Sequence, residues 1–230
     1  MKDLYSKDYA IIEFLMVFTN HKNDKLIENG IGERNLMKIG LIRHGMTDWN
    51  VERRAQGQTD IPLNHVGKDQ AIALANRLTG ENWDLIISSH LSRAYATAKA
   101  IADKLNIPLY KDERLQERGF GLLEGTTEAE RVEKWGTSWK DIDFGEESTT
   151  DVRKRSLSAI EEACLQYPNK RILFVSHGAT LKQLFITLLK DETFDKGFHN
   201  TSLSIFEKQD NNWECTLLNC SVHLEQTMNK

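Results

Sequence analysis

Apolar runs of strand length alternate with segments of helical periodicity along most of this chain. The strand-like runs occupy residues 38–42, 85–89, 171–176, 202–207 and 214–219. The helix-like segments lie at about residues 66–79, 92–105, 127–135, 149–166 and 179–190. This alternation predicts an α/β fold with a mostly parallel central sheet. The sequence KQDNN predicts a turn between the last two strands.

The first 36 residues do not share this alternation. Their apolar cluster, AIIEFLMVF at residues 10–18, is interrupted by Glu13, is followed by no small-residue cleavage site and is far shorter than the ~20 residues that cross a bilayer. We therefore expect neither a targeting peptide nor a membrane anchor. Residues 1–36 are predicted to be a non-catalytic N-terminal extension, and residues 37–230 the functional domain.

Composition and charge narrow the class of protein further. Of the 230 residues, 40% are hydrophobic and 28% are charged, which suits one large globular domain. The formal net charge is −4, whereas a general nucleic-acid binder usually has a basic face. Three cysteines form an odd set without C-x-x-C spacing, so no disulfide framework or zinc knuckle is expected. These features predict a cytoplasmic protein without a nucleic-acid or membrane partner.

Unusual polar residues follow three of the predicted strands. Arg43 and His44 come after the first strand, Arg93 after the second and His177 after the third. Open α/β sheets bind ligands at the carboxyl ends of their strands. We therefore expect these four side chains to lie in one pocket.

The residue types in this pocket predict a phosphate ligand. Gly45 and Gly178 directly follow the two histidines, and a residue without a side chain lets the backbone approach a ligand closely. Guanidinium groups bind phosphate with a fork of donors, and helix N-termini add amide donors and a favourable dipole. We expect Arg43 to bind a phosphate monoester and His44 to attack it.

A metal site is the competing use of the two histidines. It would require a carboxylate or a third imidazole beside them, whereas the same strand ends supply Arg43 and Arg93, whose charges repel a divalent cation. No metal and no other cofactor is therefore expected.

A proton donor is expected in the charged segment 112–125. Release of an alkoxide requires an acid, and a partly buried carboxyl group is suited to that task. Glu117 and Glu124 are both candidates. An exposed turn with solvated ion pairs is the alternative interpretation of this segment.

Four ordered motifs resemble the histidine phosphatase superfamily, also called the phosphoglycerate mutase-like family, from Met37 to about Glu225. They are Arg43-His44-Gly45 with MTDWN after it, SSHLSRAYATA at residues 88–98, LQERGFGLLEG at residues 115–125, and VSHG at residues 175–178. The resemblance implies a three-layer sandwich in which helices flank the central sheet.

The resemblance also implies a role for each matching residue. His44 corresponds to the nucleophile that becomes phosphohistidine, His177 to the second histidine of the phosphate site, and Glu117 to the general acid. Arg43 and Arg93 correspond to the two arginines that bind the phosphoryl group. The remaining substrate-binding positions implied are Asn50, Gln56, Gly57 and Gly178.

Within this family the sequence favours a phosphatase over a phosphoglycerate mutase. Mutases of the family share the sequence [ST]-G-W in a loop where this chain has Gln56-Gly57-Gln58. They also share a G-L-N-K stretch, which is absent here after Gly125, and the insert before Ser148 is short in this chain. A less enclosed pocket lets water intercept a phosphohistidine. The expected activity is metal-independent hydrolysis of a small-molecule phosphate monoester. A phosphoglycerate mutase is the second hypothesis, and a catalytically weak binding module on the same fold is the third.

The substrate and the oligomeric state stay open at this point. Sugar phosphates, α-ribazole phosphate and simple aryl or alkyl phosphates all fit the predicted chemistry. Specificity is expected to depend on residues 124–148 and 199–202. A homodimer and a monomer are equally compatible with the sequence.

Overall fold

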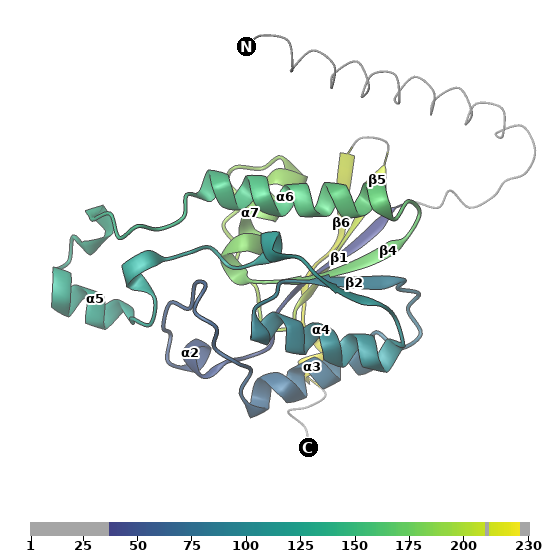
Figure 1. Ribbon diagram of the computed structural model, residues 1–230, viewed down its shortest axis with the longest axis horizontal. Helices are drawn as coiled ribbons and strands as arrows, with labels where there is room; N and C mark the ends of the chain where they lie inside the picture. The colour runs from purple at the N-terminus through teal and green to yellow at the C-terminus, as the bar shows by residue number, and fades with distance from the viewer. Residues whose placement is uncertain (1–36, 210–211, 226–230) are drawn as a thin grey trace, which may run out of the picture. The chain divides into compact units, whose positions relative to one another are not determined.

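The computed structural model describes residues 37–209 and 212–225, whose arrangement is shown in Figure 1. The strands are β1 (Lys38–Arg43), β2 (Leu85–Ser88), β3 (Leu109–Lys111), β4 (Arg171–Ser176), β5 (Leu203–Gln209) and β6 (Asn212–Cys220). The helices are α2 (Asp48–Val51), α3 (His65–Arg77), α4 (Ser92–Leu105), α5 (Glu128–Trp135), α6 (Thr149–Gln166), α7 (Gly178–Leu189) and α8 (Val222–Glu225). Short 3-10 helices are η1 (Glu113–Leu115), η2 (Gly121–Leu123) and η3 (Trp139–Asp141). The predicted α/β fold is confirmed.

The strands form one sheet in the order β3-β2-β4-β1-β5-β6. Pairs among β1, β2, β3 and β4 are parallel, whereas β5 runs antiparallel to both β1 and β6. Strand β3 was not predicted, because it has three residues at the edge of the sheet and only Leu109 among them is partly buried. Residues 210 and 211 of the predicted turn lie outside the described residues.

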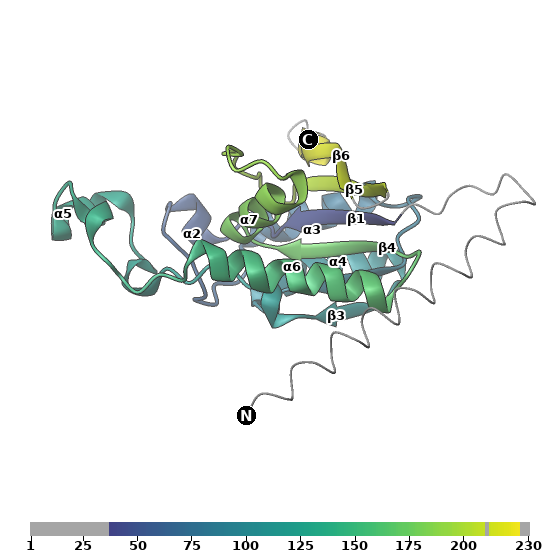
Figure 2. The same ribbon diagram turned by 90° about the horizontal axis from the view of Figure 1, so that it is seen from above.

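Alternate side chains of the sheet face two separate layers of helices. On one face, Ile39 and Leu41 of β1 pack in a core that contains Leu184 of α7. On the other face, Ile42 packs in a core that contains Leu74 of α3. Figures 1 and 2 show α6 and α7 on one side of the sheet and α3 and α4 on the other. This is the three-layer sandwich that the resemblance implied.

Residues 119–147 form a segment that we call the cap. It includes α5 and has a small apolar cluster of its own, in which Leu123, Trp139 and Phe144 are buried together. Figure 1 shows α5 away from the sheet, on the same side of the molecule as α2. The cap contains residues 126–147, the short insert between Gly125 and Ser148 that distinguishes the sequence from the mutases.

The predicted N-terminal extension lies outside the described residues. Its apolar cluster at residues 10–18 is part of this stretch, so the non-catalytic role of residues 1–36 stays a prediction. Among the described residues, no helix combines the length and the apolar character that a bilayer crossing requires.

Candidate active site

The parallel strands β1 and β4 bring the predicted histidines together at their carboxyl ends. The register of β1 against β4 sets Arg43 beside Ser176. His44 and His177 are the next residues after these two, and the centroids of their rings lie 5.1 Å apart. The pocket is thus assembled at the carboxyl ends of the strands, where open α/β sheets bind ligands.

His44 is buried as a neutral imidazole with a defined tautomer. Its Nδ1 lies 2.7 Å from the carbonyl oxygen of Gly45, and because a carbonyl can only accept, Nδ1 carries the proton. Burial, followed by the charges of Arg43 and Arg93, lowers the pKa of His44 well below its ordinary value of 6.5. Its Nε2 therefore keeps a lone pair at neutral pH, which is the state that a nucleophile requires.

His177 is the N-cap residue of α7, and both of its ring nitrogens have protein partners. The Nε–H of Arg93 donates to Nδ1 at 3.2 Å, so the proton of the neutral ring is on Nε2, which lies 2.8 Å from Ser89 Oγ. Burial, followed by the charge of Arg93, lowers the pKa of His177 well below 6.5. Two neutral rings can face one another without repulsion.

The Arg43 side chain retains a donor for a ligand. Its Nη1 donates to the carbonyl of Phe198 at 2.6 Å, whereas its Nε is buried without a partner among the described residues. A Cβ built on Gly178 would lie 3.7 Å from this Nε, so the glycine leaves space beside the guanidinium. Because buried N–H groups are nearly always paired, the Arg43 Nε indicates the position of an acceptor such as a phosphoryl oxygen.

Arg93 is fully buried and is held largely by the protein itself. Its Nη1 donates to the carbonyl of Thr59 at 2.9 Å and its Nη2 to the carbonyl of Gly57 at 2.7 Å, in addition to the bond to His177. Burial lowers the pKa of Arg93 to about 10, so the group is charged at neutral pH. The N–H groups that these acceptors do not use are the ones left for a phosphate.

Glu124 holds the loop that supplies the acceptors of Arg93. Its Oε1 accepts from the N–H of Gln58 at 3.0 Å, and its Oε2 accepts from the N–H and the hydroxyl of Thr59. Burial alone would raise the pKa of Glu124, but these hydrogen bonds outweigh it and lower the pKa. The Glu124 carboxylate thus holds this loop, whereas Glu117 lies beside Gly178 together with the Nε of Arg43, so Glu117 is the better placed of the two candidate acids.

Gln56 and Gly57 also meet protein partners in this loop. Gln56 is buried, and its Oε1 lies 3.0 Å from Thr47 Oγ1. Gly57 has a φ of 54°, and a Cβ at this position would collide with Oε1 of Glu124. A side chain here would displace the carboxylate that holds the loop, and for this reason the position requires glycine.

Glu117 lies at the N-terminus of α7 with its two oxygens in different surroundings. Oε1 accepts from the N–H groups of Arg118 and Thr180, at 2.9 and 3.0 Å, and the Thr180 hydroxyl lies 3.2 Å away. Oε2 accepts from the N–H of Ala179 at 3.1 Å. A Cβ on Gly178 would lie 3.9 Å from Oε2, which places this oxygen beside the same open space as the Arg43 guanidinium. Oε2 is therefore the oxygen suited to exchange a proton with a ligand.

The site also contains two residues, Asn200 and Ser89, that the sequence did not predict. Asn200 donates from Nδ2 to the carbonyl of His44 at 3.0 Å, and the same nitrogen lies 3.3 Å from Oδ1 of Asn50. Ser89 contacts His177, as described above. Ser89 belongs to the motif SSHLSRAYATA and could have been found there. Asn200 lies in the segment expected to affect specificity, but no local pattern indicated its contact with His44.

A cavity of about 370 Å³ lies beside Asn50, between α2 and the cap. Its lining combines aromatic rings with guanidinium groups, namely Trp49, Arg53, Arg54, Phe120, Arg131 and Trp139. The Arg53 side chain is exposed and has no partner among the described residues. The lining also includes the carboxylate of Glu146, and Arg54 is paired with Glu52 and Glu130, so the cavity is of mixed charge.

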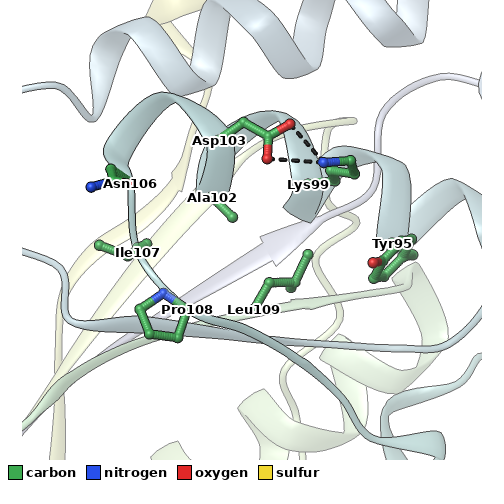
Figure 3. A pocket seen from close by; sticks show the side chains of 8 residues that line it. All are labelled: Tyr95, Lys99, Ala102, Asp103, Asn106, Ile107, Pro108 and Leu109. Atoms are coloured by element: carbon green, nitrogen blue, oxygen red, sulfur yellow. Dashed lines mark hydrogen bonds and ion pairs between the residues drawn. The ribbon is translucent and has the colours of Figure 1, made fainter.

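A second cavity, of about 540 Å³, lies along α4 and β3 (Figure 3). Lys99 and Asp103, which line it, neutralise one another in an ion pair of 2.8 Å. None of the predicted site residues contributes to its lining. We therefore place no step of the reaction there.

The described residues contain no group of three or more His, Cys, Asp or Glu side chains arranged to hold a metal ion. The two histidines instead face two arginines. The charge that would stabilise a bound dianion is therefore supplied by guanidinium groups.

Comparison with known proteins agrees with this geometry. The Histidine phosphatase superfamily (branch 1) matches residues 39–221 of the chain, which include every predicted site residue. The chain belongs to the histidine phosphatase superfamily. The uncharacterized phosphatase PhoE of Bacillus subtilis (strain 168) is 32% identical over 188 residues, which are 81% of this chain and 96% of PhoE.

Other members of the superfamily carry different names. The probable phosphoglycerate mutase GpmB of Yersinia pestis (strain Pestoides F) is 37% identical over 191 residues, which are 77% of this chain and 88% of GpmB. A phosphoserine phosphatase variant from Entamoeba histolytica, solved with phosphoserine, is 32% identical with a TM-score of 0.70, and the match covers 82% of this chain and 99% of that one. Both phosphatases and a mutase are thus similar to this protein.

Proposed function

We propose that the protein hydrolyses small phosphate monoesters through a phosphohistidine formed on His44. The observation that carries the proposal is the neutral His44, whose Nε2 keeps a lone pair, beside the buried and unpartnered Nε of Arg43. The relatives named as phosphatases support it, and the phosphoserine phosphatase structure holds a small phosphate monoester.

In the first step the phosphoryl group lies between the guanidinium groups of Arg43 and Arg93. Nε2 of His44 attacks phosphorus, and the bond from phosphorus to the leaving oxygen breaks. The two arginines stabilise the charge on the phosphoryl oxygens. The Nε2–H of His177, which lies 2.8 Å from Ser89 Oγ in the free protein, is the donor that we assign to a phosphoryl oxygen.

Glu117 moves the proton in both steps. Its Oε2 protonates the leaving oxygen as the bond breaks, and the departing group lies toward the cavity beside Asn50. The resulting carboxylate then accepts a proton from the water that attacks the phosphohistidine. Inorganic phosphate leaves, and His44 and Glu117 return to their starting protonation states.

Phosphoglycerate mutase is the second candidate because GpmB is 37% identical to the chain. A mutase must return the phosphoryl group to bound phosphoglycerate rather than to water. The short cap and the Gln56-Gly57-Gln58 loop favour attack by water. Phosphatase and mutase activities measured side by side on the purified protein decide between the two.

Leaving-group dependence tests the assignment of Glu117. An alkyl phosphate expels a strongly basic oxygen that must be protonated, whereas a nitrophenyl phosphate expels a stable anion. Glu117→Gln should lower kcat/KM for the alkyl ester by about 10²–10⁴, the usual contribution of general acid catalysis, and should change kcat/KM for the aryl ester far less. The aryl ester should also give a burst of nitrophenol, because water attack is slowed. Equal losses in kcat/KM for both esters would reject this role.

Metal independence, a cytoplasmic location and the choice between monomer and homodimer stay predictions of the sequence. For the first, activity after exhaustive treatment with a chelator should equal the untreated activity, since Arg43 and Arg93 supply the positive charge. Loss of activity that zinc or manganese restores would contradict His44 as the nucleophile.

A further inference from the structure

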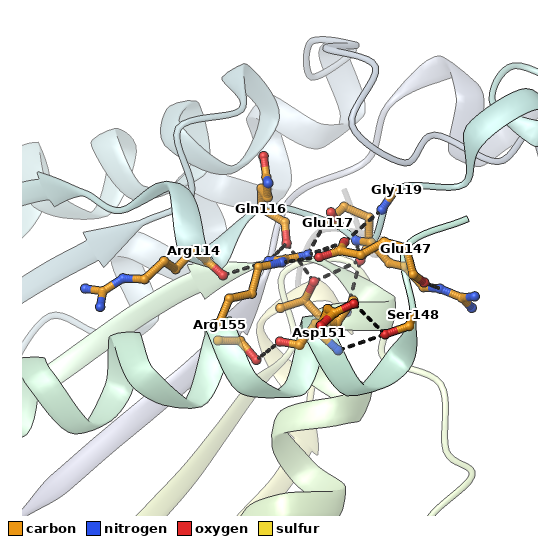
Figure 4. A network of polar contacts seen from close by, with 12 residues as sticks. Arg114, Gln116, Glu117, Gly119, Glu147, Ser148, Asp151 and Arg155 are labelled. Carbon is orange, nitrogen blue, oxygen red and sulfur yellow. Dashed lines mark hydrogen bonds and ion pairs between the residues drawn. The ribbon is translucent and has the colours of Figure 1, made fainter. Parts of the chain in front are cut away.

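The segment that carries Glu117 has little regular structure of its own. It extends from η1, which contains Arg114, to the start of η2. Three of its backbone carbonyls, at Arg114, Gln116 and Glu117, point toward one side chain of α6 (Figure 4). That side chain is Arg155.

Every N–H donor of the Arg155 guanidinium has an acceptor. Nη1 donates to the carbonyls of Arg114 and Gln116, both at 2.7 Å, and Nη2 donates to the carbonyl of Glu117 at 3.1 Å. Nε and Nη2 donate to the two carboxylate oxygens of Glu147 at 2.7 and 2.9 Å. These bonds use the complete fork that an arginine offers, and the three donors of a lysine could not replace them.

Glu147 fixes the far end of the same segment. Its Oε2 accepts from the N–H of Gly119 at 3.1 Å, and its own N–H donates to the Gly119 carbonyl at 2.8 Å. Its carbonyl accepts from Nε of Arg118 at 2.7 Å. Burial alone would raise the pKa of Glu147, but the hydrogen bonds from Arg155 and Gly119 outweigh it and lower the pKa. Glu147 is thus held as a carboxylate, and together with Arg155 it contacts the backbone on both sides of Glu117.

We propose that Arg155 and Glu147 are positioning residues that hold Glu117 for proton transfer. The inference rests on the proposed function, in which Glu117 is the general acid. The hydrogen bonds to Oε1 orient the carboxyl group relative to α7, while the Arg155–Glu147 pair sets where the backbone beneath it lies. Displacement of a reacting group by about 1 Å can cost a factor of about 10² in rate, so a loose backbone would slow proton transfer.

The helix offers a matched control residue. Arg153, two positions earlier on α6, forms an ion pair of 2.7 Å with the exposed Glu192 and also contacts Gln183. None of its partners belongs to the segment that carries Glu117. Substitution of Arg153 therefore removes an arginine and an ion pair from the same helix without touching the acid.

The test compares Arg155→Lys, Arg155→Gln and Glu147→Gln in the full-length protein with Arg153→Gln. The substrates are nitrophenyl phosphate and an alkyl phosphate that the wild type hydrolyses, chosen from phosphoserine, glycerol 3-phosphate and 3-phosphoglycerate. We expect kcat/KM for the alkyl ester to fall about 10- to 100-fold in the first three variants and the aryl ester to change far less. Arg153→Gln should leave both values unchanged. Arg155→Lys keeps the charge and so preserves a measurable variant if Arg155→Gln unfolds.

A double variant separates positioning from a general structural role. In the Glu117→Gln background the acid is already lost, so adding Arg155→Lys should produce no further fall for the alkyl ester. A further fall there, or equal losses for both esters in the single variants, would overturn the inference while leaving the phosphatase intact. A wild type without phosphatase activity would instead reject the proposed function, and the inference with it.

Discussion

At the scale of single residues, the reactivity of His44 depends on one hydrogen bond and on burial. The Gly45 carbonyl fixes the proton on Nδ1, and burial keeps the ring neutral. We predict that acid-labile, base-stable phosphate can be trapped on His44 when turnover is quenched. His44→Ala should eliminate both the adduct and turnover, because it removes the nucleophile.

His177→Ala is the matched comparison for this prediction. It removes a donor to the phosphoryl group but not the nucleophile, so the loss should be about 10²–10³, as for a lost oxyanion donor. Mass spectrometry of the quenched enzyme locates the phosphate. An adduct that persists in His44→Ala would show that the two histidines have the opposite roles.

At the scale of elements, Glu124 couples the 56–59 loop to the phosphate site. Its carboxylate accepts from that loop, and the loop carbonyls hold Arg93. Glu124→Gln replaces one of the two accepting oxygens with an NH₂ donor, which cannot accept from the loop. We predict that the inhibition constant of inorganic phosphate rises about tenfold or more, since a hydrogen bond to a charged group contributes about 1.5–3 kcal/mol.

Glu192→Gln is the control for the Glu124 variant, because Glu192 is exposed and pairs with Arg153 far from the loop. It should leave phosphate inhibition unchanged. If Glu124→Gln bound phosphate as tightly as the wild type, Arg93 would be held by α4 alone and the loop would have no part in binding.

At the scale of the whole molecule, buried neutral histidines make stability depend on pH. His223 is buried, accepts or donates a hydrogen bond of 3.0 Å with Thr201 Oγ1, and has a pKa lowered to about 4 by burial and by the charge of Arg77. Its unfolded pKa is about 6.5, so the unfolded chain binds the proton more tightly. The contribution of His223 is therefore complete above pH 6.5 and is lost as the pH falls toward 4.

Urea unfolding between pH 7 and 5 tests whether the free energy of unfolding falls as the pH is lowered. We predict a loss of about 2 kcal/mol at pH 5 from His223, with further losses from His44 and His177. His223→Gln removes one titrating group, so its unfolding midpoint should fall less over the same range. An equal fall in the variant would show that other groups control the acid response.

The functional domain is predicted to be complete from Met37 onward. Every predicted strand and motif follows this residue, so a protein that begins at Met37 should fold and keep its kcat. Steady-state kinetics and the melting temperature of the shortened protein test this. A large fall in kcat at an unchanged melting temperature would show that residues 1–36 shape the pocket.

The sequence by itself determined the class of fold and the chemistry at the strand ends. Apolar periodicity is a local property, and it located each strand except β3, whose three residues at the sheet edge bury too little to leave a pattern. Arg43, His44 and His177 were evident because they directly follow apolar runs, and Arg93 because it lies at the start of the helix after one; parallel strands bring their carboxyl ends together.

Only the tertiary structure decided how these groups are held. The motif resemblance already implied Glu117 as the acid, but only the structure shows Glu117 at the N-terminus of α7 and Glu124 accepting from the 56–59 loop. Arg155 reaches the backbone beneath Glu117 across 38 positions of the chain. No local pattern encodes such partners, because hydrogen bonds between distant residues form only after the layers have packed and buried their donors and acceptors together.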